Sequence, residues 1–353
     1  MKFGFYFIFI LTSTLGISAQ SGRVKPAESP TPSSIIRPTV IYIPTQPVAK
    51  TPLPSPTPAA TPLGDDEVIK VESALVPIPV SAVDSNGRSV TNLKLSDFEL
   101  RVDGKPVEIS DLARSETPIR LAMLFDNSSS VMIAREFEKD AAVKFFRRII
   151  RPEKDLAALY SIASDARLEQ RLTADTGLLT RSIELFPPPE GATKLLDGII
   201  LASEYLAESQ GRRVIVIVSD GDDTLSDSTL EQTLKALQLA NAQVYVVKTT
   251  DFENYKRTGV RGGNANIRQL VAERRMLEIT AQTGGAVYSP IDERELEDAF
   301  RQISAELAQQ YVLSYYPEGD NEKPGEFRQI SLAVKSKPNV TVRTRKGYYV
   351  PKR

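Results

Sequence analysis

The chain has 353 residues, of which 41% are hydrophobic and 25% charged, the balance of a soluble globular protein large enough for two domains. Its 44 basic and 45 acidic residues nearly cancel, so no strong overall field draws it to nucleic acid or to an acidic membrane. Histidine and cysteine are absent, which excludes Ser-His-Asp and Cys-His catalysis and the usual ligands of zinc, copper, haem and iron–sulfur clusters. Any bound metal must therefore be held by oxygen, which favours hard cations such as Mg²⁺, Mn²⁺ or Ca²⁺.

The amino terminus predicts export. Residues 1–19 contain one lysine at position 2, an apolar run to about Gly16 and small residues before Gln20, which is the layout of a secretory signal peptide. A retained membrane anchor is the alternative, but the run falls short of the ~20 residues that a spanning helix needs. We therefore expect cleavage, no stable membrane insertion afterwards, and a mature protein that is periplasmic, on the cell surface or extracellular.

Residues 20–64 are dense in proline, serine and threonine, as in "KTPLPSPTPAATPLG". Such a segment cannot bury enough apolar surface to fold, and proline stiffens it toward polyproline II. We predict a linker that could hold the folded part on the order of 100 Å from its start.

Residues 65–116 change to a period of two, typical of strands. Two prolines inside "LVPIPVSAV" favour the edge of a sheet for that strand. Asn86-Gly87 and Asp103-Gly104 suit hairpin turns that need a positive φ. Strand patterns return in residues 311–353, so we predict one small β-sandwich that is discontinuous in sequence, with its first part in 65–116 and its second part in 311–353.

Residues 117–310 alternate strands with helices. The strand candidates are "IRLAMLF", "LAALYSI", "RLEQRLT", "RVIVIVS", "AQVYVVK" and "GAVYS", and the helix candidates are "REFEKDAAVKFFRRII", "KLLDGIILASEYLAES", "TLEQTLKALQLAN" and "ERELEDAFRQISAELAQQ". This alternation predicts an α/β domain with a doubly wound, mainly parallel sheet covered by helices on both faces. "RLEQRLT" follows its neighbour after a short turn and should form an antiparallel edge strand.

Oxygen-bearing side chains follow two of these strands. Asp126, Ser128 and Ser130 lie at i, i+2 and i+4 after the first strand, a spacing that points all three the same way in extended backbone. Asp220 follows a second buried strand, and Thr193 stands at the start of a helix, where we expect its hydroxyl to be exposed. Because ligands of α/β sheets bind at the carboxyl ends of the strands, these loops could hold a cation together. The alternative is that the serines and aspartates only cap helices.

This order of residues resembles the metal-ion-dependent adhesion site of von Willebrand factor type A (VWA) domains. The match consists of Asp-x-Ser-x-Ser after the first strand, a threonine before a helix, and Ser-Asp-Gly after the fourth strand. The flanks "VSAVDSNGRSVTNLKLSDFELRVDGKPVEI" and "YVLSYYPEG…FRQISLAVKSKPNVTVRTRKGYYV" are similar to those of a bacterial family of secreted VWFA-related proteins, and the resemblance covers about Val68 to Val350.

The resemblance implies a metal site and a binding function. Ser128 and Ser130 would bind the ion directly, Thr193 directly or through water, and Asp126 and Asp220 mostly through water. Hydroxyl and water ligands would leave the ion, Mg²⁺ or alternatively Mn²⁺ or Ca²⁺, a replaceable position for an aspartate or glutamate of a partner protein. The sequence thus favours a secreted, metal-dependent protein-binding module and not an enzyme.

Two other functions remain open at this point, a structural envelope protein with an unused metal site and, less favoured, a metal-assisted hydrolase. The hydrolase would need a general base near the ion, and no histidine exists to serve. We interpret Asp222 and Asp223 as loop caps and not as a catalytic pair. "TTDFENYKRTGVRGGNANIRQ" is expected to lie on the metal face as a flexible, basic insertion, or alternatively to attract an acidic partner.

Overall fold

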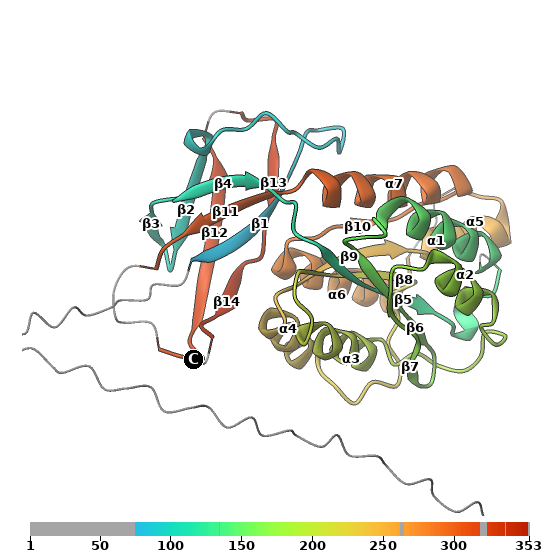
Figure 1. Ribbon diagram of the computed structural model, residues 1–353. Coiled ribbons are helices and arrows are strands. Elements are labelled where there is room, and N and C mark those ends of the chain that lie inside the picture. Colours follow the sequence, from blue (N-terminus) through green and yellow to red (C-terminus); the bar gives the residue numbers. More distant parts are fainter. Residues whose placement is uncertain (1–74, 134, 262–264, 318–322, 336, 352–353) are drawn as a thin grey trace, which may run out of the picture. The chain divides into compact units, whose positions relative to one another are not determined.

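The computed structural model describes residues 75–133, 135–261, 265–317, 323–335 and 337–351 (Figure 1). The elements below belong to one compact unit, residues 68–353. The predicted signal peptide, 1–19, and linker, 20–64, lie outside the described residues. Among the residues that are described, no helix is long and apolar enough to cross a membrane.

A six-stranded sheet forms the centre of the α/β domain, in the order β10-β9-β8-β5-β6-β7. The strands are β5 (Ile119–Asp126), β6 (Leu156–Ile162), β7 (Ala166–Thr173), β8 (Arg212–Ser219), β9 (Ala242–Lys248) and β10 (Val287–Tyr288). All neighbours pair in parallel except β6 and β7, which confirms the mainly parallel sheet and the antiparallel edge strand. From β5 the chain continues to β6 on one side and later crosses to β8 on the other, so strand order reverses between β5 and β8.

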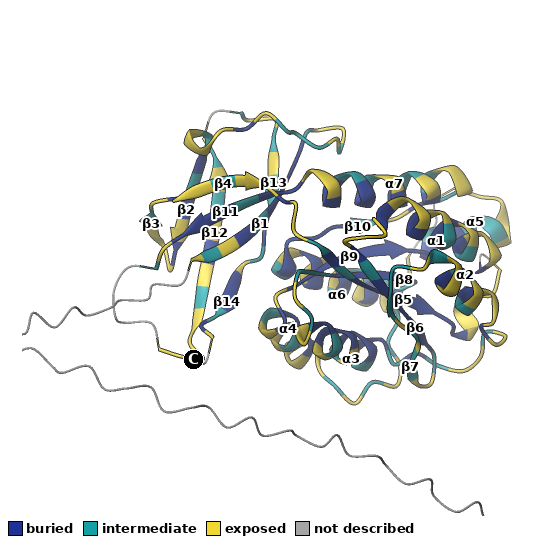
Figure 2. Cartoon of the chain, in the orientation of Figure 1, coloured by how far each residue is buried: buried dark blue, intermediate teal, exposed yellow. Residues whose placement is uncertain are grey.

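Helices cover both faces of this sheet, as predicted (Figure 1). They are α1 (Arg135–Ile149), α2 (Thr176–Glu184), α3 (Leu195–Ala207), α4 (Leu230–Leu239), α5 (Thr250–Thr258), α6 (Ile267–Thr283) and α7 (Glu293–Gln309). Alternate residues of β5 join separate hydrophobic clusters, Met123 packing with residues of α1, α2 and α7, and Leu124 with residues of α3, α4 and α6. Figure 2 shows the strands as a buried layer between helices with exposed outer faces. This arrangement fixes the strand ends, where the candidate site lies.

The segment after β9, for which a flexible insertion was predicted, contains helix α5 and the start of helix α6. Helix α5 occupies its first half and ends at Thr258, and the φ of 71° at Gly259 suits a left-handed cap. Helix α6 begins at Ile267 in its second half, and Asn266 caps it by accepting a hydrogen bond from the Gln269 amide.

Two antiparallel four-stranded sheets form the β-sandwich, in the orders β13-β1-β11-β4 and β14-β12-β2-β3. Their strands are β1 (Val76–Val83), β2 (Phe98–Val102), β3 (Lys105–Val107), β4 (Asp111–Arg114), β11 (Tyr311–Tyr315), β12 (Phe327–Val334), β13 (Thr341–Arg343) and β14 (Gly347–Tyr349). Both sheets contribute to one hydrophobic cluster, which includes Val80, Leu100, Leu313 and Ile330. Strands from both flanks of the α/β domain therefore build one core, as predicted. The exact domain limits, 65–116, 117–310 and 311–353, stay a prediction.

The edge position predicted for β1 was wrong, because β1 lies between β13 and β11. The pairing with β13 involves only Ser81 to Val83, beyond both prolines, while Pro77 and Pro79 pair in register with β11 alone. The Pro77 and Pro79 carbonyls accept hydrogen bonds from Arg345 and Thr344, which follow β13, so the polar groups of both prolines face away from β11. Their missing amide hydrogens therefore interrupt no ladder, and this is why an inner strand tolerates two prolines.

Polar contacts join the sandwich to the α/β domain around Glu306 of α7. This carboxylate is 3% exposed, forms an ion pair with Arg343 of β13, and accepts hydrogen bonds from the Tyr288 hydroxyl at 2.6 Å and the Tyr245 hydroxyl at 3.2 Å. The side-chain amide of Gln310 donates a hydrogen bond to the Ser81 hydroxyl of β1 at 3.1 Å. The interface between the β-sandwich and the α/β domain is therefore buried and polar.

Removing the N-cap side chain of helix α2 tests how much one capping residue contributes to the free energy of unfolding. The Asp175 carboxylate accepts hydrogen bonds from the amides of Gly177 at 2.7 Å and Leu178 at 3.3 Å. We expect Asp175→Ala to lower the free energy of unfolding by about 1 kcal/mol in urea denaturation. Asp140→Ala, which removes only an exposed ion pair with Lys144, should change it by less than about 0.5 kcal/mol. Equal effects of the two variants would contradict the capping role.

Candidate metal site

The candidate site lies at the point where strand order reverses. β5 ends at Asp126 and β8 ends at Ser219, and the two strands are hydrogen-bonded neighbours with Phe125 opposite Val218. Because the chain leaves these strands toward opposite sides of the sheet, their connections diverge and leave a crevice, which is where open α/β sheets bind ligands.

Asp126 is buried at the bottom of this crevice, with 1% of its surface exposed. One carboxylate oxygen accepts a hydrogen bond from the Ser128 amide at 2.9 Å, and the other accepts one from the Ser219 hydroxyl at 2.5 Å. Burial, followed by the neighbouring Asp220 carboxylate, raises the pKa of Asp126 to about 7. The protein thus holds a buried acid near a second carboxylate, an arrangement that a cation would stabilise.

The two serine hydroxyls predicted as ligands lie together, with Ser128 Oγ 2.9 Å from Ser130 Oγ. The residue spacing predicts this proximity only for an extended backbone. That assumption was wrong, because residues Ser129–Val131 form a 3₁₀ turn. Ser129 turns aside, and its hydroxyl donates to the Gly191 carbonyl at 3.0 Å. Ser130 is exposed and Ser128 is buried, so the pair lines the crevice from its floor to its rim.

Thr193 approaches from the loop before α3. Its amide donates to the Thr224 hydroxyl at 3.0 Å and its carbonyl accepts from the Thr224 amide at 2.9 Å, which ties this loop to the one after β8. The expectation of an exposed hydroxyl was wrong, since only 3% of Thr193 is exposed. The helix begins two residues later, and Asp223 caps it by accepting from the Leu195 amide, which confirms Asp223 as a cap.

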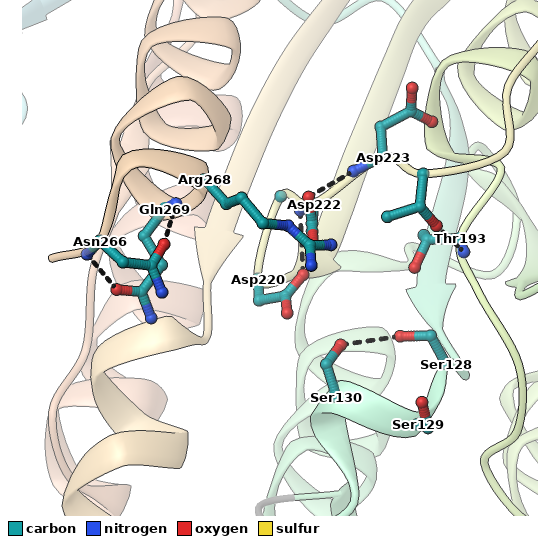
Figure 3. A network of polar contacts seen from close by, with 12 residues as sticks. Ser128, Ser129, Ser130, Thr193, Asp220, Asp222, Asp223, Asn266, Arg268 and Gln269 are labelled. Carbon is teal, nitrogen blue, oxygen red and sulfur yellow. Dashed lines mark hydrogen bonds and ion pairs between the residues drawn. The ribbon is translucent and has the colours of Figure 1, made fainter.

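Asp220 comes from the loop after β8 and is half-buried. The Asp222 amide donates to its carboxylate at 3.0 Å, and the Thr250 hydroxyl donates to its carbonyl at 3.1 Å. Figure 3 shows that the side chains of Ser128, Ser130, Thr193 and Asp220 surround one space. Three loops that are distant in sequence therefore bring their oxygens to one place.

These residues fit a hard cation better than a soft one. They supply two carboxylates and three hydroxyls, and the described part of the chain contains no group of three or more histidine, cysteine, aspartate or glutamate side chains that could hold a metal. An ion at this place would depend on hydroxyl and water ligands, which suits Mg²⁺, Mn²⁺ or Ca²⁺.

A pocket of about 350 Å³ opens beside the site. Ser130 and Asp220 form one wall, and residues of the segment after β9 form the other, among them Glu253, Arg257, Asn266, Arg268 and Gln269. That segment therefore lies on the metal face, as predicted. Arg268 forms an ion pair with Asp222 (Figure 3), so this aspartate anchors the loop after β8. No sequence pattern predicts that Glu253 lines this pocket, because its position depends on how α5 packs.

Residues 121–222 match the family model of the von Willebrand factor type A domain. This part of the chain is a VWA domain. The matched range begins in β5 and ends at Asp222, so it contains all five predicted site residues. The search of curated proteins found no match.

Solved structures with a similar fold include bacterial VWA and pilus proteins. BatB from Bacteroides thetaiotaomicron is 15% identical, with 54% of this chain and 99% of that chain covered and a TM-score of 0.41. The PilB minor pilin from Streptococcus sanguinis is 13% identical, with 57% and 63% covered and a TM-score of 0.43. A von Willebrand factor type A protein from Catenulispora acidiphila is 10% identical, with 80% and 76% covered and a TM-score of 0.45.

Proposed function

We propose that this VWA domain is an exported module that binds an acidic residue of a partner protein through a divalent cation. Asp126, Ser128, Ser130, Thr193 and Asp220 would hold the ion. The observation that carries the proposal is the crevice at the β5–β8 switch point, where Asp126 is buried near Asp220 and two serine hydroxyls lie 2.9 Å apart.

Each residue has a distinct part in this proposal. The Ser128 and Ser130 hydroxyls face the crevice as neutral ligands, while the two aspartates provide the negative charge. A divalent cation held mainly by hydroxyls and water keeps exchangeable positions, one of which a partner's carboxylate can take. Since Ser130 is exposed and Asp220 is half-buried, that position would face the open side of the crevice.

The surroundings of the site favour a protein partner with further negative charge. Arg257 is exposed, lines the pocket and forms no ion pair among the described residues, so it can attract an acidic ligand. The first turns of α6 line the same pocket and also expose Ile267, Leu270 and Val271. Apolar side chains beside a polar pocket are typical of protein-binding surfaces.

The proposal is tested with Mn²⁺, whose exchangeable waters enhance the relaxation of solvent protons. We expect the full chain to give this enhancement, and a short peptide containing aspartate to reduce it by displacing water, while the same peptide with asparagine does not. The double variant Ser128→Ala/Ser130→Ala should lose the enhancement. Ser129→Ala is the matched control, because this hydroxyl bonds to Gly191 and does not face the ion, and it should behave like the parent.

Either of two results would reject the proposal. One is an enhancement that survives in the double serine variant, which would place Mn²⁺ elsewhere on the chain. The other is an equal response to the aspartate and asparagine peptides, which would leave an ion site with no selectivity for carboxylate and favour a structural role.

A further inference from the structure

Arg268 of α6 extends across the pocket to the loop that carries Asp220. Its guanidinium forms an ion pair with the Asp222 carboxylate, and Figure 3 shows the side chain pointing from the helix toward this loop. The Asp222 amide in turn donates a hydrogen bond to the Asp220 carboxylate at 3.0 Å. The guanidinium therefore lies one residue away from a proposed ligand of the ion, and Arg268, Asp220 and Ser130 line the same pocket of about 350 Å³.

The ion pair is not the only contact that fixes this loop. The Thr250 hydroxyl donates to the Asp220 carbonyl at 3.1 Å, and the Arg275 guanidinium donates to the Gly221 carbonyl at 3.2 Å. Gly221 also lies against α6, since a Cβ added to it would be 3.2 Å from a side-chain carbon of that helix. These contacts remain when Arg268 moves, so its guanidinium can change partner without releasing the loop.

The ion pair is exposed to solvent, which makes it easy to replace. The Arg268 side chain is 69% exposed and that of Asp222 is 31% exposed. Ion pairs at such exposure contribute little to stability, because water screens both charges. A carboxylate that is already held in the pocket by a metal ion can therefore compete with Asp222. The planar guanidinium suits this exchange, since its donors fit a carboxylate.

The first turn of α6 makes this wall of the pocket positive. Arg268 is the second residue of the helix, where the partial positive charge of the helix N-terminus favours acidic side chains and disfavours basic ones. The first turn nevertheless contains no acidic residue. Its positive end is therefore not neutralised within the turn and, together with Arg268, favours an anion in the pocket.

We propose that Arg268 binds the carboxylate that the metal ion recruits, and that it leaves Asp222 to do so. The inference rests on the proposed function, because the ion must first bring the carboxylate into the pocket. One oxygen of the partner's aspartate or glutamate binds the ion, and the other accepts hydrogen bonds from Arg268. This arginine is then a specificity-determining residue for the partner and not a ligand of the ion.

Asp222 acts in the opposite direction. Its carboxylate competes with the partner for Arg268 and repels a second carboxylate in the same pocket. Breaking the ion pair from its two sides therefore has opposite consequences, because loss of Arg268 weakens partner binding and loss of the Asp222 charge strengthens it. If the ion pair only held the loop in place, both changes would weaken binding.

The test uses the Mn²⁺ relaxation enhancement of the full chain, titrated with the peptide Gly-Ser-Asp-Ser-Gly. Each variant is saturated with Mn²⁺, and the peptide concentration that produces half of the decrease is measured. We expect Arg268→Met to raise this concentration about tenfold, as the loss of a hydrogen bond between charged groups implies, and Asp222→Asn to lower it severalfold. Arg274→Met is the matched control, because this exposed arginine of α6 is not among the residues that line the pocket, and it should match the parent.

The parent protein separates this inference from the proposed function. A parent without enhancement, or without a response to the peptide, would reject the proposed function and this inference with it. If the parent responds and Arg268→Met needs the same peptide concentration or a lower one, only the inference is overturned. A higher concentration in both Arg268→Met and Asp222→Asn also overturns it, because the ion pair then serves to hold the loop.

Discussion

Arg343→Met is expected to lower the free energy of unfolding by about 3 kcal/mol, because it leaves a buried carboxylate without its cation. Glu306 is 3% exposed, and its partners in the structure are Arg343 and the hydroxyls of Tyr245 and Tyr288. Without Arg343 only the two tyrosine hydroxyls remain, and they carry no charge to offset that of Glu306. Urea denaturation of the parent and the variant at pH 7 measures the difference.

The control for this prediction is Arg101→Met, which removes an ion pair with Glu99 whose side chains are 51% and 31% exposed. It should cost less than about 1 kcal/mol. Adding Glu306→Gln to Arg343→Met should restore part of the loss, since the buried charge is then gone. If the double variant is no more stable than the single one, the contribution of Arg343 comes from packing and not from the ion pair.

The strands of the central sheet could be predicted because each is a short apolar run, and burial on both faces requires such runs. Helix α6 could not. Its buried face consists largely of Ala272, Met276, Ile279 and threonines, while larger apolar residues such as Ile267 and Leu270 point to solvent. The two faces therefore carry competing patterns, and no single amphipathic stripe marks the helix.

The candidate site could likewise be predicted only in part. The positions of Asp126 and Asp220 after two buried strands were enough to predict that their loops meet, because parallel strands place their carboxyl ends at one edge of the sheet. Thr193 lies between α2 and α3, so this reason does not extend to it. The 3₁₀ turn after Ser128 was missed, since residue spacing alone does not fix the backbone of a loop. Phe137 of α1 and Phe252 of α5 meet only through the packing of these two helices, which no local pattern encodes.

Asp126→Asn is expected to abolish stabilisation by Mg²⁺. At a concentration 100-fold above its dissociation constant, a ligand that binds only the folded state adds about 2.7 kcal/mol to the free energy of unfolding. The variant keeps the size of the side chain and an oxygen acceptor for the Ser128 amide, so its metal-free form should fold. Urea denaturation with and without Mg²⁺ measures the loss, and an undiminished response to Mg²⁺ in Asp126→Asn would contradict the role of this carboxylate.

The response to Mg²⁺ should also depend on pH, because protons compete with the ion for Asp126. Burial and the Asp220 carboxylate raise the pKa of Asp126 from its ordinary 3.8 to about 7, so without metal the folded state binds more protons than the unfolded state between these values. This group therefore makes the metal-free protein less stable as pH rises from about 4 to 7, and the component should vanish in Asp126→Asn. Stabilisation by Mg²⁺ should have the opposite trend, small at pH 5 and complete above about pH 8. Equal stabilisation at pH 5 and pH 8 would show that the ion does not need the ionised carboxylate.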